Sequence, residues 1–387
     1  MSSRNAYRVR SSLVQPPIAL PPAIEAAIRA GAWIVFNLSG GKDSSAALFA
    51  AMPVLDALGH PRERRIAIHA DLGRAEWDST AETVATIAAR ADIALTIRQR
   101  QSGDLFDRWH QRYESGKARY EELSTYNLIG PWSSASLRFC TSEQKAQVIG
   151  PYLARQLAGE TIIQVIGIRR DESSARAIAP DWKRDSRFAA EGNRAGTRML
   201  IWHPVIDWAT ADVFAFHKTH GIPLHEAYTR YRSSRLSCRY CVLQSLADQQ
   251  AASSAPSNHQ AFVHLVALEA RSTFSFQPGR WLADSAPHLL TGTLAADIER
   301  AKHAACERRQ LESTMPPDLR FQRGWPPRLP TPDEATRIAA ARAPILQRHR
   351  LENRFPTGQT VIARFADLIA LKRENERPDH SREESPS

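Results

Sequence analysis

Residues 33–45 read WIVFNLSGGKDSS, and the rest of the chain is organised around this stretch. Its first half is an almost continuous apolar run with β-branched members, which is typical of a strand covered on both faces. The chain then turns at Ser39 and carries apolar residues at helical spacing from Ala46 to Ala51. The stretch therefore predicts a strand, a glycine-bearing turn and a helix in direct succession.

The turn has the chemistry of an anion site. Gly40 and Gly41 let the backbone approach a ligand closely, and the N–H groups at the start of a helix point outward together. The helix dipole favours negative charge there, and Lys42 adds a full positive charge. A Walker A loop is excluded, because Phe36 stands where its first glycine would be and Asp43 follows the lysine. A phosphate cradle of another kind is predicted; the alternative is a tight connection whose polarity is incidental.

Strands and helices alternate after this stretch. A β-type run from Arg65 ends in Asp71 and Gly73, and a further run at 161–166 ends in Gly167. Helices are expected at 76–91 and 210–220, a third strand at 93–97, and an end or kink of the first helix at Pro53. This order predicts a parallel α/β sheet, in which ligands lie beyond the carboxyl ends of the strands. The loops at 39–44 and 71–73 should then border one crevice.

The amino-acid composition indicates which classes of ligand and partner are compatible with the chain. Lys and Arg number 51 against 41 Asp and Glu, which leaves a formal net charge of +10. Such an excess is compatible with acidic ligands and with DNA or RNA as an acceptor, although scattered arginines are more typical of a solvated surface. No apolar run approaches the roughly 18 residues that span a bilayer, so we expect a cytoplasmic protein with no membrane contact.

Four segments are predicted along the chain. Residues 1–22 form a basic, proline-bearing arm, and 23–250 form the α/β domain. Residues 251–373 form a helical C-terminal region that opens with an Ala-, Ser- and Pro-rich linker at 251–258. Residues 374–387 are expected to be a disordered tail.

Several ordered blocks together resemble the phosphoadenosine phosphosulfate (PAPS) reductase-like family of PP-loop proteins, in the adenine-nucleotide α-hydrolase superfamily. DndC-type enzymes of DNA phosphorothioation belong to the same group. The resemblance covers roughly 30–245 and implies a Rossmann-like, doubly wound parallel sheet with a helical C-terminal appendage. The matching pieces are Ser39 to Ser44, Asp71-Leu-Gly73, Cys140-Thr141 with Lys145, Gly167-x-Arg169 with Glu172-Ser173 and Arg176, Pro204 to Asp212, Gly221-Ile-Pro223, and Ser237-Cys238-x-x-Cys241.

The resemblance also implies roles for these residues. Nucleotide phosphate would lie on Ser39, Gly40, Gly41, Lys42, Asp43 and Ser44, with Gly167 also in the binding site. Asp71 and Gly73 would border the adenosine, and Arg169 and Arg176 would face the anionic end. Asp43 suits a structural role or Mg²⁺ better than a role as a base. The nucleotide would be ATP, with Mg²⁺, or PAPS or APS (adenosine phosphosulfate).

Cys140, Cys238 and Cys241 form a second candidate site. The resemblance suggests a [4Fe–4S] cluster on these three thiolates, which would leave one iron open to a sulfur species. Zinc completed by a nearby histidine (His217, His220 or His225), a redox CxxC pair beside Arg235 and Arg239, and an unmetallated pair are the alternatives. The histidines themselves are expected to be structural, and Cys306 to be an ordinary helix cysteine.

The expected function is that of an enzyme that acts at the phosphate or sulfate end of an adenine nucleotide, in sulfur transfer or in adenylation of an acceptor. One alternative is thiol-dependent reduction of PAPS. Against it, residues 373–387 contain no cysteine of the Glu-Cys-Gly type that dedicated reductases carry. The other alternative is a non-catalytic nucleotide-sensing subunit of a nucleic-acid modification or defence complex. Possible partners are a sulfur donor and defence-complex proteins.

Overall fold

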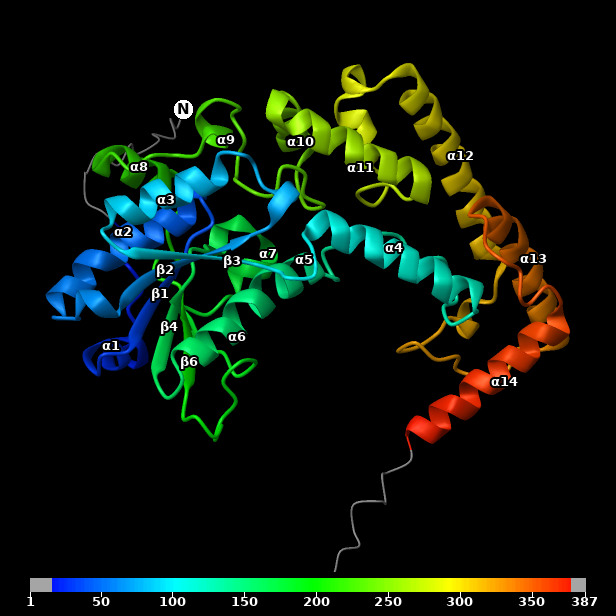
Figure 1. The fold of residues 1–387 in the computed structure, drawn as a ribbon, viewed down its shortest axis with the longest axis horizontal. Coiled ribbons are helices and arrows are strands. Elements are labelled where there is room, and N and C mark those ends of the chain that lie inside the picture. Colours follow the sequence, from blue (N-terminus) through cyan, green and yellow to red (C-terminus); the bar gives the residue numbers. More distant parts are fainter. Residues whose placement is uncertain (1–15, 377–387) are drawn as a thin grey trace, which may run out of the picture. The chain divides into compact units, whose positions relative to one another are not determined.

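The structure is a computed structural model that describes residues 16–376, so most of the predicted N-terminal arm and of the predicted tail lies outside the described residues. The α/β part is built on a six-stranded sheet, of which Figure 1 labels β1, β2, β3, β4 and β6. The strand order is β3-β2-β1-β4-β6-β5, and only β5 runs antiparallel to its neighbour. The strands are β1 (Trp33–Asn37), β2 (Arg65–Asp71), β3 (Ala94–Gln99), β4 (Thr161–Val165), β5 (Trp182–Arg184) and β6 (Arg198–Trp202). The predicted parallel α/β class is confirmed.

Helices cover both faces of this sheet. Successive residues of a strand point to opposite faces, so neighbouring residues of one strand pack against different helices. Ile34 and Phe36 of β1 pack with helices on one face, whereas Val35 packs on the other face with α6. The first face carries α1 (Pro22–Arg29), α2 (Lys42–Ala57), α3 (Thr80–Arg90) and α8 (Thr210–His220). The second face carries α6 (Gln147–Gln156). Burial on both sides explains why the central strand β1 is a nearly continuous apolar run.

The helix that follows the loop does not end at Pro53, one of the two expected outcomes there. α2 continues through Pro53 to Ala57. Proline removes one backbone N–H from the helix, but Ala50, Ala51 and Leu55 around it are fully buried against the sheet. Their packing therefore outweighs the lost hydrogen bond.

Contacts divide the chain into two compact units. Unit 1 takes the described residues up to Ser102 together with Phe139–Arg239, and it holds the whole sheet. Unit 2 takes Gly103–Arg138 together with the described residues from Tyr240 onward. This division differs from the predicted boundary at 250, because 103–138 leave the α/β unit and pack with the C-terminal helices.

Unit 2 is helical. One of its cores joins Leu123 and Tyr126 to residues of the last two helices, among them Ile338 and Phe365. The predicted linker at 251–258 is wrong in its first part, since α10 ends at Ser253. The helices are α4 (Leu105–Glu121), α10 (Leu246–Ser253), α11 (His259–Ser272), α12 (Gly292–Thr314), α13 (Pro332–Arg348) and α14 (Gly358–Asn375).

The end of α14 overlaps the predicted tail. Residues 374 and 375 are helical, and 377–387 lie outside the described residues. Between 16 and 376, no helix combines the length and the apolar character that crossing a membrane requires.

Candidate functional site

The predicted phosphate loop lies at the carboxyl end of a central strand of the sheet in unit 1. β1 ends at Asn37, Gly40 takes a left-handed conformation with φ +73°, and α2 begins at Lys42 directly after its N-cap Gly41. Because β1 pairs with both β2 and β4, the ends of those strands flank the loop. A non-glycine residue at position 40 would be strained, which accounts for one of the two glycines.

Three backbone N–H groups at this turn have no acceptor among residues 16–376: those of Gly40, Asp43 and Ser44. The first hydrogen bond into α2 is made by Ser45, whose N–H donates to the carbonyl of Gly41 at 3.2 Å. The N–H groups before it are the orphan donors that every helix start leaves. Donors of this kind, at the positive end of a helix dipole, suit a phosphate or sulfate oxygen.

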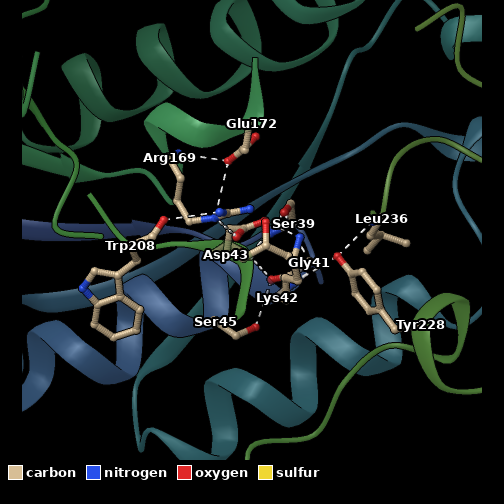
Figure 2. Close-up of polar contacts among 12 residues, drawn as sticks. Ser39, Gly41, Lys42, Asp43, Ser45, Arg169, Glu172, Trp208, Tyr228 and Leu236 are labelled. Carbon is tan, nitrogen blue, oxygen red and sulfur yellow. Dashed lines mark hydrogen bonds and ion pairs between the residues drawn. The ribbon is translucent and has the colours of Figure 1, made fainter. Parts of the chain in front are cut away.

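The remaining N–H groups of the loop have partners within unit 1. The N–H of Gly41 donates to Ser39 Oγ at 3.4 Å, and the N–H of Lys42 donates to Tyr228 Oη at 3.3 Å (Figure 2). Tyr228 Oη also accepts from Leu236 N at 2.9 Å. The tyrosine therefore ties the start of α2 to a segment almost two hundred residues further along the chain.

Charged side chains surround the loop in a balanced network. The Lys42 ammonium is buried above the rings of Phe214 and Tyr228 and lies 3.0 Å from one carboxylate oxygen of Asp43. The other Asp43 oxygen lies 2.6 Å from Nε of Arg169 (Figure 2). Both oxygens of Asp43 are thus engaged by cations. This arrangement agrees with a structural role for Asp43 and leaves little of it for a Mg²⁺ ion.

Arg169 is 2% exposed and is held by several acceptors. Its guanidinium also pairs with Asp171 and donates to the Trp208 carbonyl at 3.3 Å. Burial acts to lower the pKa of Arg169, but the carboxylates of Asp43 and Asp171 outweigh it and raise that pKa. Nη2 has no acceptor among the described residues, so this atom remains available for the predicted contact with a ligand.

Arg176 pairs with Glu172, which also accepts the N–H of Arg169 at 2.9 Å. The network as a whole contains as many carboxylates as cations. Its members are Lys42, Arg169 and Arg176 on one side and Asp43, Asp171 and Glu172 on the other. Since the side-chain charges cancel, affinity for an anion would depend mainly on the free N–H groups.

Gly167 follows β4 and touches the loop directly. A Cβ atom built on it would lie 2.2 Å from the carbonyl oxygen of Asp43 and 2.6 Å from the N of Ser44. Only glycine permits this approach, which holds the start of α2 against the end of β4. This is a role in shaping the loop, and the predicted contact of Gly167 with the nucleotide stays a prediction.

Asp71 and Gly73 lie at the end of β2, as predicted. The Asp71 carboxylate accepts the N–H of Gly73 at 2.7 Å, and Gly73 has φ +60°. His69, on the same strand, was not singled out from the sequence. Its Nδ1 lies 2.9 Å from the carbonyl of Leu38 and its Nε2 lies 3.1 Å from Glu76. It therefore anchors the backbone just before the phosphate loop.

His217 is a second residue that the sequence did not connect to the loop. It is buried on α8, and its Nε2 lies 2.9 Å from the Lys42 carbonyl. Burial lowers its pKa, so the ring is neutral at pH 7. The expectation of a structural histidine is consistent with this contact.

The residues present do not fit the predicted cluster or zinc site. Within residues 16–376, no three His, Cys, Asp or Glu side chains are arranged to hold a metal ion. Cys140 lies in a helical run, α5 (Phe139–Thr141), which continues through a π-helix at Ser142–Ala146. His225 caps α9 (Glu226–Thr229) and contacts hydroxyl groups, and His220 is exposed beside Phe216. Cys306 is exposed on α12, in agreement with an ordinary helix cysteine.

Comparison with known proteins adds a family to this geometry. Residues 33–242, more than half of the chain, match the model of the phosphoadenosine phosphosulfate reductase domain. A stretch of 118 residues is 31% identical to a protein of Escherichia phage 186 described as an uncharacterized 37.8 kDa protein in the gpa 5′ region. The match covers 29% of this chain and 32% of the phage protein, so the chain spans about a third of the length of that relative.

Among solved structures, the chain is similar to the PAPS reductase of Candida auris, crystallised as a phosphate complex. The sequence identity is 13%, the likeness covers 55% of this chain and 94% of the other, and the TM-score is 0.32.

Proposed function

The chain belongs to the phosphoadenosine phosphosulfate reductase domain family, and from that premise we propose that it binds an adenine nucleotide with its phosphate or sulfate end on the loop at 39–44. Membership of this family supports a coarse assignment, a sulfonucleotide-related enzyme of the PP-loop type. The finer proposal is that the chain acts at that anionic end, in sulfur transfer or in adenylation of an acceptor.

One observation carries this proposal: Gly40, Asp43 and Ser44 offer N–H groups that have no acceptor among the described residues, at the start of a buried helix. Backbone donors held in place by the fold need no rearrangement when charge develops on a ligand. Lys42 stands beside them with its charge partly offset by Asp43. The loop thus favours a dispersed negative charge, such as that of a pyrophosphate or a phosphosulfate.

The proposed reaction with ATP is an in-line displacement. An acceptor oxygen attacks the α-phosphorus, the bond from that phosphorus to the bridging oxygen of the β-phosphate breaks, and pyrophosphate leaves with the electron pair. The acceptor gives its proton to solvent. The free N–H groups of the loop would stabilise the charge that grows on the leaving pyrophosphate.

A second candidate, thiol-dependent reduction of PAPS or APS, is favoured by the family match itself. In that reaction a thiolate attacks the sulfur, the nucleotide leaves, and a second thiol releases sulfite while a disulfide forms. The loop would then bind the phosphate that remains on the nucleotide.

Binding is tested by calorimetric titration of ATP, PAPS and APS into the wild type and two variants of one glycine. A methyl group at position 41 would lie 3.4 Å from Ser39 Oγ and 3.6 Å from Tyr228 Oη, so Gly41→Ala fits the fold as it is. Gly41→Val adds bulk beside the free N–H groups. We expect near-normal binding in Gly41→Ala and a loss of at least tenfold in Gly41→Val, with unchanged circular dichroism. Equal affinity in all three proteins would remove the nucleotide from this loop.

Activity separates the candidates. Release of pyrophosphate from ATP, measured with and without DNA or RNA, supports adenylation. Release of sulfite from PAPS or APS with thioredoxin present supports reduction. Binding without either product, under both sets of conditions, would replace the enzyme by a nucleotide-sensing subunit.

A further inference from the structure

Unit 2 contains an arginine that lacks the partners a buried charge needs. Arg342, on α13, is 1% exposed. Its guanidinium carbon lies over the ring of Tyr120, 4.2 Å from the ring centre, and Nη2 donates to the Tyr120 carbonyl. Its Nε and Nη1 atoms are buried and have no hydrogen-bond partner among the described residues. No carboxylate of that part of the chain pairs with it.

The surroundings of Arg342 are apolar. Tyr120 belongs to a hydrophobic cluster with Leu128, Ile345 and Leu346. An ion in such surroundings is strongly destabilised unless an opposite charge compensates it. Burial lowers the pKa of Arg342 to about 10, which still leaves the group charged at neutral pH.

A second buried guanidinium, that of Arg308 on α12, adds to the positive charge. It is 8% exposed and stacks on Phe274 at 3.7 Å. Glu312 pairs with it at 3.2 Å, and the carbonyl of Thr273 accepts a hydrogen bond at 3.3 Å. Its Nε has no partner in the described chain. The charges of Arg308 and Arg342 both act on the hydroxyl group of Tyr120.

A neutral donor is unpaired beside these guanidinium groups: the hydroxyl of Tyr120 is buried and has no partner among the described residues. Nε2 of His349 is also buried without a partner there. Tyr113 Oη lies 2.9 Å from His349 Nδ1 but also donates to the Arg271 carbonyl at 3.3 Å, so Nε2 of His349 is not counted as a donor. Burial lowers the pKa of His349 to about 4, and the ring is neutral. Donors therefore exceed acceptors in this cluster, which holds two guanidinium ions and one carboxylate.

We propose that Arg342, Arg308 and Tyr120 form an internal site for a small inorganic anion. An anion would supply the missing negative charge and accept from the unpaired N–H and O–H groups. A water molecule would satisfy some of these donors but would leave the excess charge in place. The site lies outside the residues that match the reductase domain, apart from Tyr120, and is independent of the proposed nucleotide site.

The test is thermal unfolding of the full chain in chloride, phosphate or sulfate, with sodium gluconate holding the ionic strength constant. Gluconate is too large for a buried site. Above the dissociation constant, each tenfold rise in a binding anion adds about 1.4 kcal/mol to the stability of the folded state. We expect the unfolding temperature of the wild type to rise with at least one of the three anions.

Three variants assign the effect. In the Gly41→Val background, where the phosphate loop should no longer contribute, Arg342→Met should abolish the anion-dependent shift, and Arg337→Met, an exposed arginine of the same helix, should keep it. The Gly41→Val protein should also show the anion-dependent shift. A shift that is lost in Gly41→Val alone and persists in Arg342→Met alone would belong to the phosphate loop and would overturn the proposal. Absence of any shift in the wild type overturns it as well.

Tyr120→Phe covers the case in which Arg342→Met does not fold. This change removes only the unpaired hydroxyl and keeps the ring on which Arg342 stacks. We expect the anion concentration needed for a given shift to rise on the order of tenfold. An unchanged concentration dependence in Tyr120→Phe, together with a crystal grown in bromide that shows no anomalous peak beside Arg342, refutes the site.

Discussion

Replacing Gly167 by alanine is expected to separate the phosphate loop from the strand that supports it. The new methyl group would lie 2.2 Å from the carbonyl oxygen of Asp43, where real Cβ atoms essentially never come closer than 3.0 Å. The loop and the strand end must therefore move apart by about 0.8 Å. No side chain can rotate away to relieve this contact, because both of the nearest residues contribute backbone atoms.

The size of the effect follows from which part moves. β4 is hydrogen-bonded to β1 on one side and to β6 on the other, so the start of α2 is the softer element. Overpacking of this kind costs about 1–3 kcal/mol of stability. The shift also moves the N–H of Ser44, and a hydrogen bond to a charged group contributes about 1.5–3 kcal/mol. We therefore expect nucleotide affinity to fall by about tenfold or more.

Urea unfolding and calorimetric titration with ATP and PAPS measure the two effects separately. Gly292→Ala is the matched control, since Gly292 is the first residue of α12, its φ is not positive, and nothing lies within 4 Å of the added methyl group. The control should be neutral or stabilised by up to about 1 kcal/mol, with normal binding. A Gly167→Ala protein that is as stable as the wild type and binds as tightly would refute the close approach.

Two further variants test the residues that position the loop. In His69→Gln, stability should lose part of its dependence on pH: burial acts to lower the pKa of His69, but Glu76 outweighs it and raises that pKa above 6.5. The stabilisation by protonated His69 is therefore full below pH 6.5 and is lost as the pH rises through the higher pKa of the folded state. The free energy of unfolding in urea, measured from pH 5 to 9, should depend on pH more steeply in the wild type; the same pH dependence in both proteins would contradict this. Tyr228→Phe should lose about 1–3 kcal/mol, because the buried N–H groups of Lys42 and Leu236 lose their acceptor. An unchanged urea midpoint would show that neither bond contributes.

The sheet was predictable where the strands are uninterrupted apolar runs. β1 falls inside the predicted run, and β2 ends at Asp71 as expected. β6 was missed, because its buried residues Met199–Trp202 follow a long polar and charged segment that hides them. α10 was missed for a different reason. Its Ala and Ser residues are typical of a linker, and only tertiary packing shows that Ala252 and Ser253 are fully buried.

The loop at the candidate site was predictable from local spacing, but the contacts that hold it were not. His217 and Tyr228 reach main-chain atoms of Lys42 across 175 and 186 residues of sequence. A side chain that bonds to a backbone atom leaves no pattern, since any residue offers the same carbonyl or N–H group. The charge network around Asp43 was equally hidden. The resemblance places Arg169 and Arg176 at the anionic end of the nucleotide, which stays a prediction, and nothing in the spacing indicated that carboxylates of the chain itself engage both.

The carboxylate partners of the other buried arginines bear directly on the proposed anion site of unit 2. Arg169 is neutralised by Asp43 and Asp171, and the buried guanidinium of Arg65 has Asp56 at 2.6 Å. Where this chain buries a guanidinium, it normally supplies a carboxylate. Arg342 is as deeply buried as either of them and has none among the described residues. Because replacing an uncompensated buried charge by an apolar side chain is usually stabilising, an arginine at this position is best explained by a negative charge that comes from solution.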